Sequence, residues 1–127
     1  MLQLDGSRYT GALSAQNIAD FIAAGIGRYV AGTEQGVGST YTAEQLDACA
    51  RGGLAKALYV YLDPARSASA QVVNGQDVAG QAVLDFLALD AEDEGYPADP
   101  SVVVPILQSA RAAVRPGLPV WWYCGTS

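Results

Sequence analysis

Histidine is absent from this chain of 127 residues. Its absence excludes a Ser-His-Asp or Cys-His nucleophile system and any zinc site that depends on imidazole ligands. Only two cysteines are present, Cys49 in a helix-like pattern and Cys124 in a strand-like pattern. Two cysteines in different element types seldom face each other with disulfide geometry, so we interpret both as buried free thiols. Chemistry based on carboxylate, tyrosine, lysine or thiol groups is what remains.

Positive charge is also scarce, because seven Lys and Arg residues stand against 13 Asp and Glu residues, for a net charge of −6. Without a basic cluster, neither nucleic acid nor an anionic membrane surface is expected as a partner, whereas a polysaccharide is compatible. No apolar run approaches the roughly 20 residues of a membrane span. The N-terminal segment lacks the basic region, the long apolar core and the cleavage site of a signal peptide.

Half of the residues are hydrophobic, which suits one domain with a core of its own over residues 1–127. Strand patterns alternate with helix patterns. Strands are predicted over 2–4, 27–33, 55–62, 87–90 and 120–124, and helices over 15–24, 42–53, 67–83 and 100–114. Thr42 and Gln45 form a capping-box pattern, and Asn74-Gly75 divides the third helix into two pieces. The alternation predicts an α/β fold with five parallel strands.

Carboxylates occur at or just past the C-terminal ends of the first four predicted strands. They are Asp5, Glu34, Asp63, Asp90 and Glu92. In a parallel sheet these ends share one edge, and in a β/α barrel they converge on one mouth. Mutual repulsion in such a cluster raises some carboxyl pKa values and keeps other groups ionised, which supplies an acid and a base from one residue type. Asp63 is left out of the candidate site, because a proline follows it and the pair is a good turn starter.

Asp90 and Glu92 are two residues apart, so on an extended backbone their side chains point to the same side. Two carboxyls held together at a strand end are what glycosidic bond cleavage needs, since one must be protonated and the other ionised. The aromatic rings of Tyr61 and Tyr123, near the same edge, could stack on sugar rings. A solvated acidic turn is the alternative for the carboxylate pair, and both interpretations stay open here.

Five short motifs follow one another in a definite order along nearly the whole chain. They are Gln3-Leu-Asp5, Thr33-Glu-Gln-Gly36, Tyr59-Val-Tyr61, Leu89-Asp-Ala-Glu92 and Pro119-Val-Trp-Trp-Tyr-Cys124. In this order the chain resembles glycoside hydrolase family 25, the Chalaropsis-type lysozymes, which are N-acetylmuramidases of bacteria and their phages. Val60 stands where the family usually has a histidine.

The resemblance implies cleavage of the β-1,4 bond after N-acetylmuramic acid in peptidoglycan. It assigns the general acid to Glu92, and it gives Asp90 the task of stabilising the charged transition state or orienting the acetamido group of the substrate. Asp5 and Glu34 are implied to line the groove. No metal and no organic cofactor is implied, and the expected place of action is extracellular or virion-associated, as for a phage endolysin.

The family fold is a TIM-related barrel of about eight strands, so five βα units predict an incomplete β/α barrel. Such a barrel has two open edges, which we expect another chain or a second copy to cover. One hypothesis is therefore a muramidase, whole or completed in trans. The other is a non-catalytic structural or sugar-binding module of a phage virion or cell-surface assembly. Only the enzyme requires Asp90 and Glu92 in a sugar-sized groove, with Glu92 shielded enough from water to hold a proton.

Overall fold

The computed structural model describes residues 1–6, 11–34, 37–38 and 41–124. The described residues form the strands β1 (Leu2–Asp5), β2 (Ile26–Glu34), β3 (Val37–Gly38), β4 (Ala55–Tyr61), β5 (Leu87–Ala91) and β6 (Val120–Cys124). They also form the helices α1 (Ala15–Ala23), α2 (Thr42–Gly52), α3 (Ala68–Ala79) and α4 (Pro100–Ala112). Gln35 and Gly36 of the second motif lie outside the described residues.

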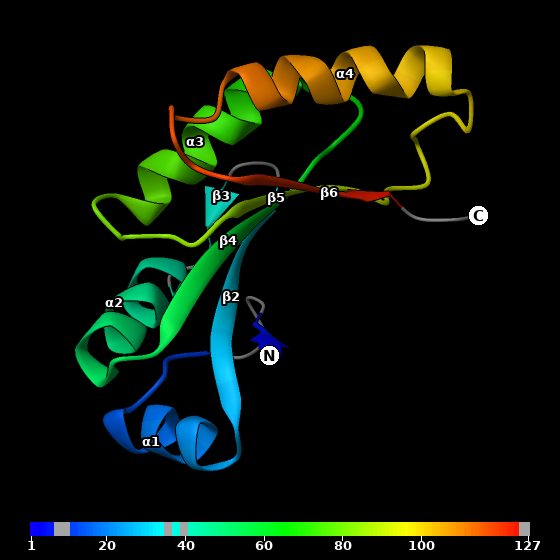
Figure 1. Cartoon of the computed structure of the whole chain (residues 1–127). Coiled ribbons are helices and arrows are strands. Elements are labelled where there is room, and N and C mark those ends of the chain that lie inside the picture. Colours follow the sequence, from blue (N-terminus) through cyan, green and yellow to red (C-terminus); the bar gives the residue numbers. More distant parts are fainter. Residues whose placement is uncertain (7–10, 35–36, 39–40, 125–127) are drawn as a thin grey trace.

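The sheet has the strand order β1-β2-β4-β5-β6, and these five strands are parallel. The short β3 pairs antiparallel with the end of β2, and its two residues carried no strand signal in the sequence. All four helices lie on one side of a curled sheet, and the other side is open (Figure 1). The prediction of an incomplete, barrel-like β/α fold with five parallel strands is confirmed.

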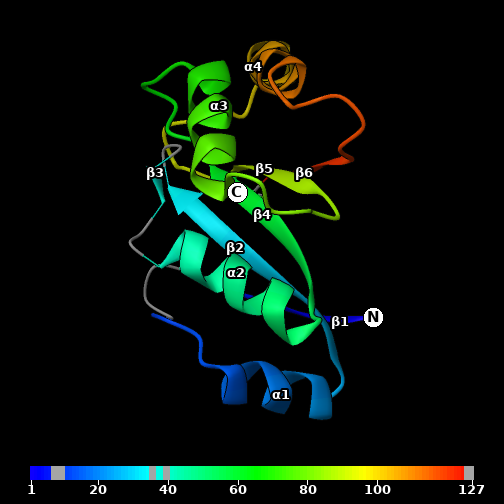
Figure 2. The same cartoon turned by 90° about the vertical axis from the view of Figure 1, so that its left-hand side faces the viewer.

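The main core lies between the sheet and the helices. Alternate residues of the central strands, among them Leu58, Val60, Leu87 and Leu89, are fully buried there. Figure 2 shows α2 and α3 lying across this side of β2 and β4. Burial of such side chains is the main favourable contribution to folding, at about 25 cal/mol for each Å² of apolar surface removed from water.

Helix α3 is continuous from Ala68 to Ala79, so the prediction of two pieces was wrong. The reason lies in the packing of Gly75 against the sheet. A Cβ atom at Gly75 would lie 2.9 Å from Cγ2 of Val60 and 3.0 Å from Oγ1 of Thr33. The glycine therefore lets the helix approach the strands closely, and it does not end the helix.

The capping-box prediction for Thr42 and Gln45 was also wrong. Both side chains are buried, and they donate to carbonyl oxygens elsewhere in the fold: Thr42 Oγ1 to Gly32 at 3.0 Å, and Gln45 Nε2 to Gly11 at 2.6 Å. A capping box is instead present at the start of α1. There Ser14 and Asn17 each accept a hydrogen bond from the backbone N–H of the other.

Cys49 is buried in α2 as a free thiol, as expected, and burial raises its pKa to about 11. The side chain of Cys124 lies outside the described part of the structure. No helix in the described residues has the length and apolar character needed to cross a membrane.

Candidate active site

The open side of the sheet carries the candidate site. We call this side, which faces away from the four helices, the inner face. On β5 the side chains of Leu87 and Leu89 enter the main core, so those of Ala88 and Asp90 point to the inner face. The same alternation applies to the other parallel strands.

One row of side chains crosses the inner face near the C-terminal ends of the strands. Glu34 pairs with Tyr61, Tyr61 with Asp90, and Asp90 with Tyr123. Paired residues of parallel strands point to the same face, and neighbouring strands lie about 4.8 Å apart. The register therefore places four residues selected from the sequence side by side, and we call them the site row.

Asp90 is the half-buried carboxyl of the site row. Its Oδ1 atom is buried and has no hydrogen-bond partner among the described residues. Burial, followed by the negative charge of Glu92, raises the pKa of Asp90 to about 7. The inner face therefore presents a carboxyl that takes up and releases a proton near neutral pH, a property of acid–base sites.

Glu92 lies one residue beyond the end of β5 and is exposed. The enzyme hypothesis expected the shielded carboxyl at this position, whereas in the structure the half-buried carboxyl of the pair is that of Asp90. The physical reason is local, because Asp90 is still held within the sheet while Glu92 has entered the following loop. The roles that the resemblance assigns to the two residues stay predictions.

Tyr59 is a neighbour of the site row that was not selected from the sequence. Its ring lies over Gly32, where a Cβ atom would be 2.0 Å from the ring atom Cζ. Burial, and then the charges of Asp90, Asp5 and Glu34, raise the pKa of Tyr59. The phenol is therefore neutral and able to donate a hydrogen bond among three carboxylates. The available signal was the two-residue spacing to Tyr61, which puts both rings on one face.

The other predicted residues occupy distinct places around the row. Asp5 pairs with Val30, four residues before Glu34 along β2, so it lies off the row although its charge reaches Tyr59. Tyr61 lies within reach of several carboxylates, and slight burial and then the charge of Asp93 raise its pKa.

Tyr96, in the loop after β5, is a second residue that the sequence did not single out. Its hydroxyl is buried and has no hydrogen-bond partner among the described residues. Burial, then the charges of Asp63 and Asp93, raise its pKa to about 12. The loop lies against the loop after β4, because a Cβ atom at Gly95 would be 2.6 Å from Cγ of Pro64. Tyr96 itself packs against the main core.

Asp63 serves as a turn residue, which agrees with leaving it out of the site. Its carboxylate accepts a hydrogen bond from the backbone N–H of Ala65 at 2.9 Å and lies 3.4 Å from Nε of Arg66. The buried side chain of Gln71 bonds both backbone polar groups of Asp63. No group of three or more potential ligands in the described residues is arranged to hold a metal ion.

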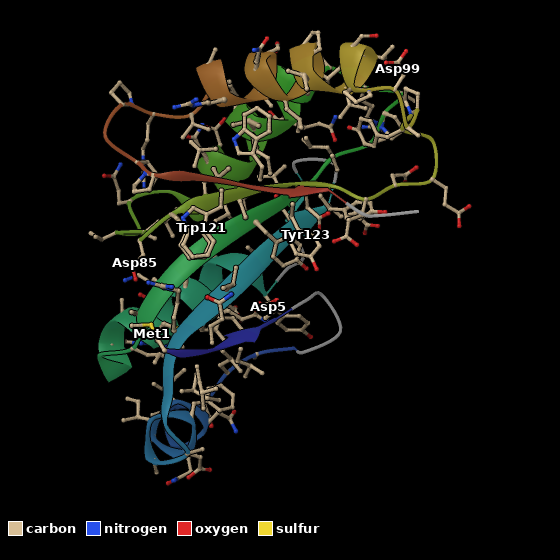
Figure 3. The ribbon with its side chains drawn as sticks, turned by 45° about the vertical axis from the view of Figure 1, so that its right-hand side comes forward. Met1, Asp5, Asp85, Asp99, Trp121 and Tyr123 are labelled. Carbon is tan, nitrogen blue, oxygen red and sulfur yellow. The ribbon has the colours of Figure 1, made fainter. Side chains whose placement is uncertain are left out.

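An aromatic stack lies on the inner face toward the N-terminal ends of β5 and β6. The guanidinium of Arg28 lies 5.0 Å from the ring centre of Phe86, and Phe86 stacks on Trp121 with ring centres 4.0 Å apart and planes 2° from parallel. Arg28 also pairs with Asp85 at 2.9 Å. In Figure 3, Trp121 and Tyr123 point from β6 to the side away from α4.

The fold is similar to that of the muramidase from Acremonium alcalophilum, with a TM-score of 0.77 and 18% sequence identity. The superposition covers 96% of this chain and 64% of that chain, so the present chain spans less than two thirds of its length. At this identity the likeness shows a muramidase-like fold alone. No protein-family model and no curated protein sequence matches the chain.

Proposed function

We propose that this chain is a glycoside hydrolase of the muramidase type, which cleaves the glycan of peptidoglycan at the site row. The observation that carries the proposal is the placement of Asp90, a recessed carboxyl two residues before the exposed Glu92, on the inner face of a muramidase-like half-barrel. A pair of carboxyls in unlike surroundings is the arrangement that separates an acid from an ionised stabiliser.

The reaction requires a proton on the leaving oxygen and a negative charge beside the developing oxocarbenium ion. We assign the acid role to Glu92, as the resemblance implies. Because Glu92 is exposed in the free protein, this role requires that the bound glycan shields its carboxyl from water and so keeps its proton in place. We assign Asp90 the orienting and stabilising role, in which it accepts a hydrogen bond from the acetamido group of the substrate or, once it has released its proton, faces the developing positive charge. The C–O bond breaks as the proton is transferred, and water then completes the hydrolysis and restores the proton.

The neighbouring aromatic side chains fit the same substrate. Tyr61 and Tyr123 flank Asp90 on either side within the row, and Tyr123 is 60% exposed. Exposed aromatic rings beside polar groups are typical of ligand sites. A peptidoglycan substrate places the protein at a cell wall, either outside a cell or on a virion, as in a phage endolysin.

The test is the release of reducing sugar ends from purified peptidoglycan by the parent chain and by its Glu92→Gln and Asp90→Asn variants. We expect each variant to lose at least about a hundredfold in rate, the usual contribution of an acid or base group. Urea unfolding of all three proteins serves as the control for folding.

If the folded parent protein releases no reducing ends, the proposal is contradicted. Glycan binding without cleavage would instead support the non-catalytic sugar-binding module. Equal rates in the parent and both variants would show that the cleavage takes place elsewhere.

A further inference from the structure

Trp121 has one ring face packed and the other open. It stacks on Phe86 with ring centres 4.0 Å apart and planes 2° from parallel, and the residue is 50% exposed. Phe86 is itself buried and is covered on its other side by Arg28. The stack fixes the tryptophan ring in one orientation before any ligand binds, which lowers the entropy cost of binding.

The surroundings of this ring are neutral, and they are continuous with the site row. The charge of Arg28 is balanced by Asp85 at 2.9 Å, so the stack offers no free cation for a phosphate. Trp121 pairs with Ala88, which is the next pair on the inner face before that of Asp90 and Tyr123. Trp121 and Tyr123 are two residues apart on one face, roughly 6.5 Å along the strand.

A neutral aromatic plane next to carboxylate acceptors matches the two sides of a pyranose ring, which has apolar C–H faces and hydroxyl donors at its rim. A nucleotide or an anionic lipid would need cations that this part of the inner face lacks. We propose that Trp121 is a sugar-stacking residue, which holds a pyranose ring of the glycan next to the ring positioned at Asp90. This inference rests on the proposed function, since it extends the glycan path from the site row to Trp121.

The chain provides a matched control in the next residue. Trp122 pairs with Leu89, so it points to the helix-covered side of the sheet, and it is 40% exposed. The two tryptophans therefore share a strand and a similar exposure but lie on opposite faces. They are also the only tryptophans in the sequence, so replacing either one leaves a single tryptophan, whose emission can be excited selectively over that of the tyrosines.

The experiment titrates soluble peptidoglycan glycan strands into the full chain in the Glu92→Gln background, which prevents turnover. In the Trp122→Phe variant, emission from Trp121 should change with saturation as glycan is added. In the Trp121→Phe variant, emission from Trp122 should stay constant. By calorimetry, Trp121→Ala should weaken glycan binding roughly five- to tenfold, while Trp122→Ala should stay within about twofold of its parent.

Each outcome separates this inference from the proposed function. Cleavage of glycan by the unmutated site, together with constant Trp121 emission on binding, overturns the inference and leaves the proposed function standing. Saturable Trp121 quenching without any cleavage supports the inference and contradicts hydrolysis. No glycan binding at all overturns both.

A protein surface over Trp121 is the competing occupant. Acrylamide quenching of Trp121 emission in the ligand-free Trp122→Phe variant tests this. If acrylamide quenches the emission only after the protein is diluted, a second copy covers the ring and the inference is overturned. Because the emission of Trp121 is read in a variant that keeps the residue, the test does not depend on whether Trp121→Ala folds.

Discussion

The two faces of this sheet are built from the same strands, yet they differ in what covers them and in what they carry. The helix-covered face holds fully buried aliphatic side chains, such as Leu58, Val60 and Leu89. The inner face has no helix layer. Toward the N-terminal ends of its strands it holds a small buried cluster of Val30, Ala57 and Phe86, and toward their C-terminal ends it carries the site row, where a buried carboxyl oxygen of Asp90 has no partner among the described residues. Leu89 and Asp90 are adjacent in the chain but lie on opposite faces.

The difference between the two faces shows that the residues that stabilise the fold lie on one face and the candidate catalytic residues lie on the other. A buried carboxyl oxygen without a hydrogen bond destabilises a fold, and a marginally stable protein can hold one only if other contacts offset it. Here the aliphatic core one residue away supplies those contacts. The alternation of a β-strand lets each strand contribute to both tasks without conflict.

The largest expected effect comes from substituting, one at a time, two adjacent residues of β5. Leu89→Ala should lower the free energy of unfolding by about 3 kcal/mol, because it removes buried methyl groups and leaves a cavity. Asp90→Asn should leave it within about 1 kcal/mol of the parent or raise it, because a costly buried charge is removed. Urea unfolding followed by circular dichroism measures both changes. Equal destabilisation by the two variants would show that the faces are not divided in this way.

The second prediction uses pH to examine the inner face. The pKa of Asp90 is raised from 3.8 to about 7 by burial and then by Glu92. The native state therefore holds this proton more tightly than the unfolded state, so stability should fall as pH rises from about 4 to about 7 and then level off. The contribution of Asp90 to this pH dependence is measured as the difference in free energy of unfolding between the parent and Asp90→Asn across this pH range. A difference that does not change with pH would contradict the raised pKa.

A third prediction compares two glycines on opposite faces. Gly75→Ala should cost about 1 to 2 kcal/mol, because its Cβ would press on the packed Val60 and Thr33. Gly32→Ala should cost less than about 1 kcal/mol, since only the ring of Tyr59, at the open face, must move.

The glycine on the inner face should instead change function. Displacement of Tyr59 moves a phenol that lies among the carboxylates, so reducing-end release by Gly32→Ala should fall while its unfolding midpoint stays close to that of the parent. Tyr59→Phe is the matched control, because it keeps the ring in place and removes only the hydroxyl. A Gly32→Ala variant with full activity would show that the position of Tyr59 is unimportant.

The smallest expected effect concerns the ion pair of Arg28 and Asp85, beside the aromatic stack. Asp85→Asn should lower the free energy of unfolding by less than about 1 kcal/mol, because Asp85 is 41% exposed and exposed pairs contribute little. The contact of Arg28 with the ring of Phe86 does not involve Asp85, so we expect it to remain in the variant. Urea unfolding is measured at low and at high salt. At high salt the free energies of unfolding of the parent and the variant should become equal, because salt screens the ion pair. A loss as large as that of Leu89→Ala would mean that the ion pair itself supports the buried cluster of Val30, Ala57 and Phe86.

Most of the element order was predictable, because strands and helices carry their own periodicities. The failures occurred where distant contacts decided the local structure. Asn74-Gly75 looks like a break in the sequence, but the close approach of α3 to β4 requires the glycine. Thr42 and Gln45 look like a cap, but their side chains satisfy carbonyls of other segments.

The sequence predicted which residues belong to the candidate site better than it predicted their burial and charge state. Strand-end positions selected Asp5, Glu34 and the Asp90–Glu92 pair, and the register then placed Glu34 and Asp90 in one row. Which carboxyl is buried was not predictable, because burial depends on where β5 ends. Tyr59 was missed because its place over Gly32 depends on the pairing of β2 with β4.

The sequence by itself determined the alternation of strands and helices, the clustering of carboxylates at strand ends and the scarcity of positive charge. These follow from local periodicity and composition, which each segment carries alone. Only the tertiary structure decided that Asp90 is the recessed carboxyl, that Tyr59 lies among three acids, and that Trp121 and Trp122 face opposite sides. The physical reason is that burial, register and stacking are relations between segments far apart in the chain, so they are settled only when the sheet is assembled.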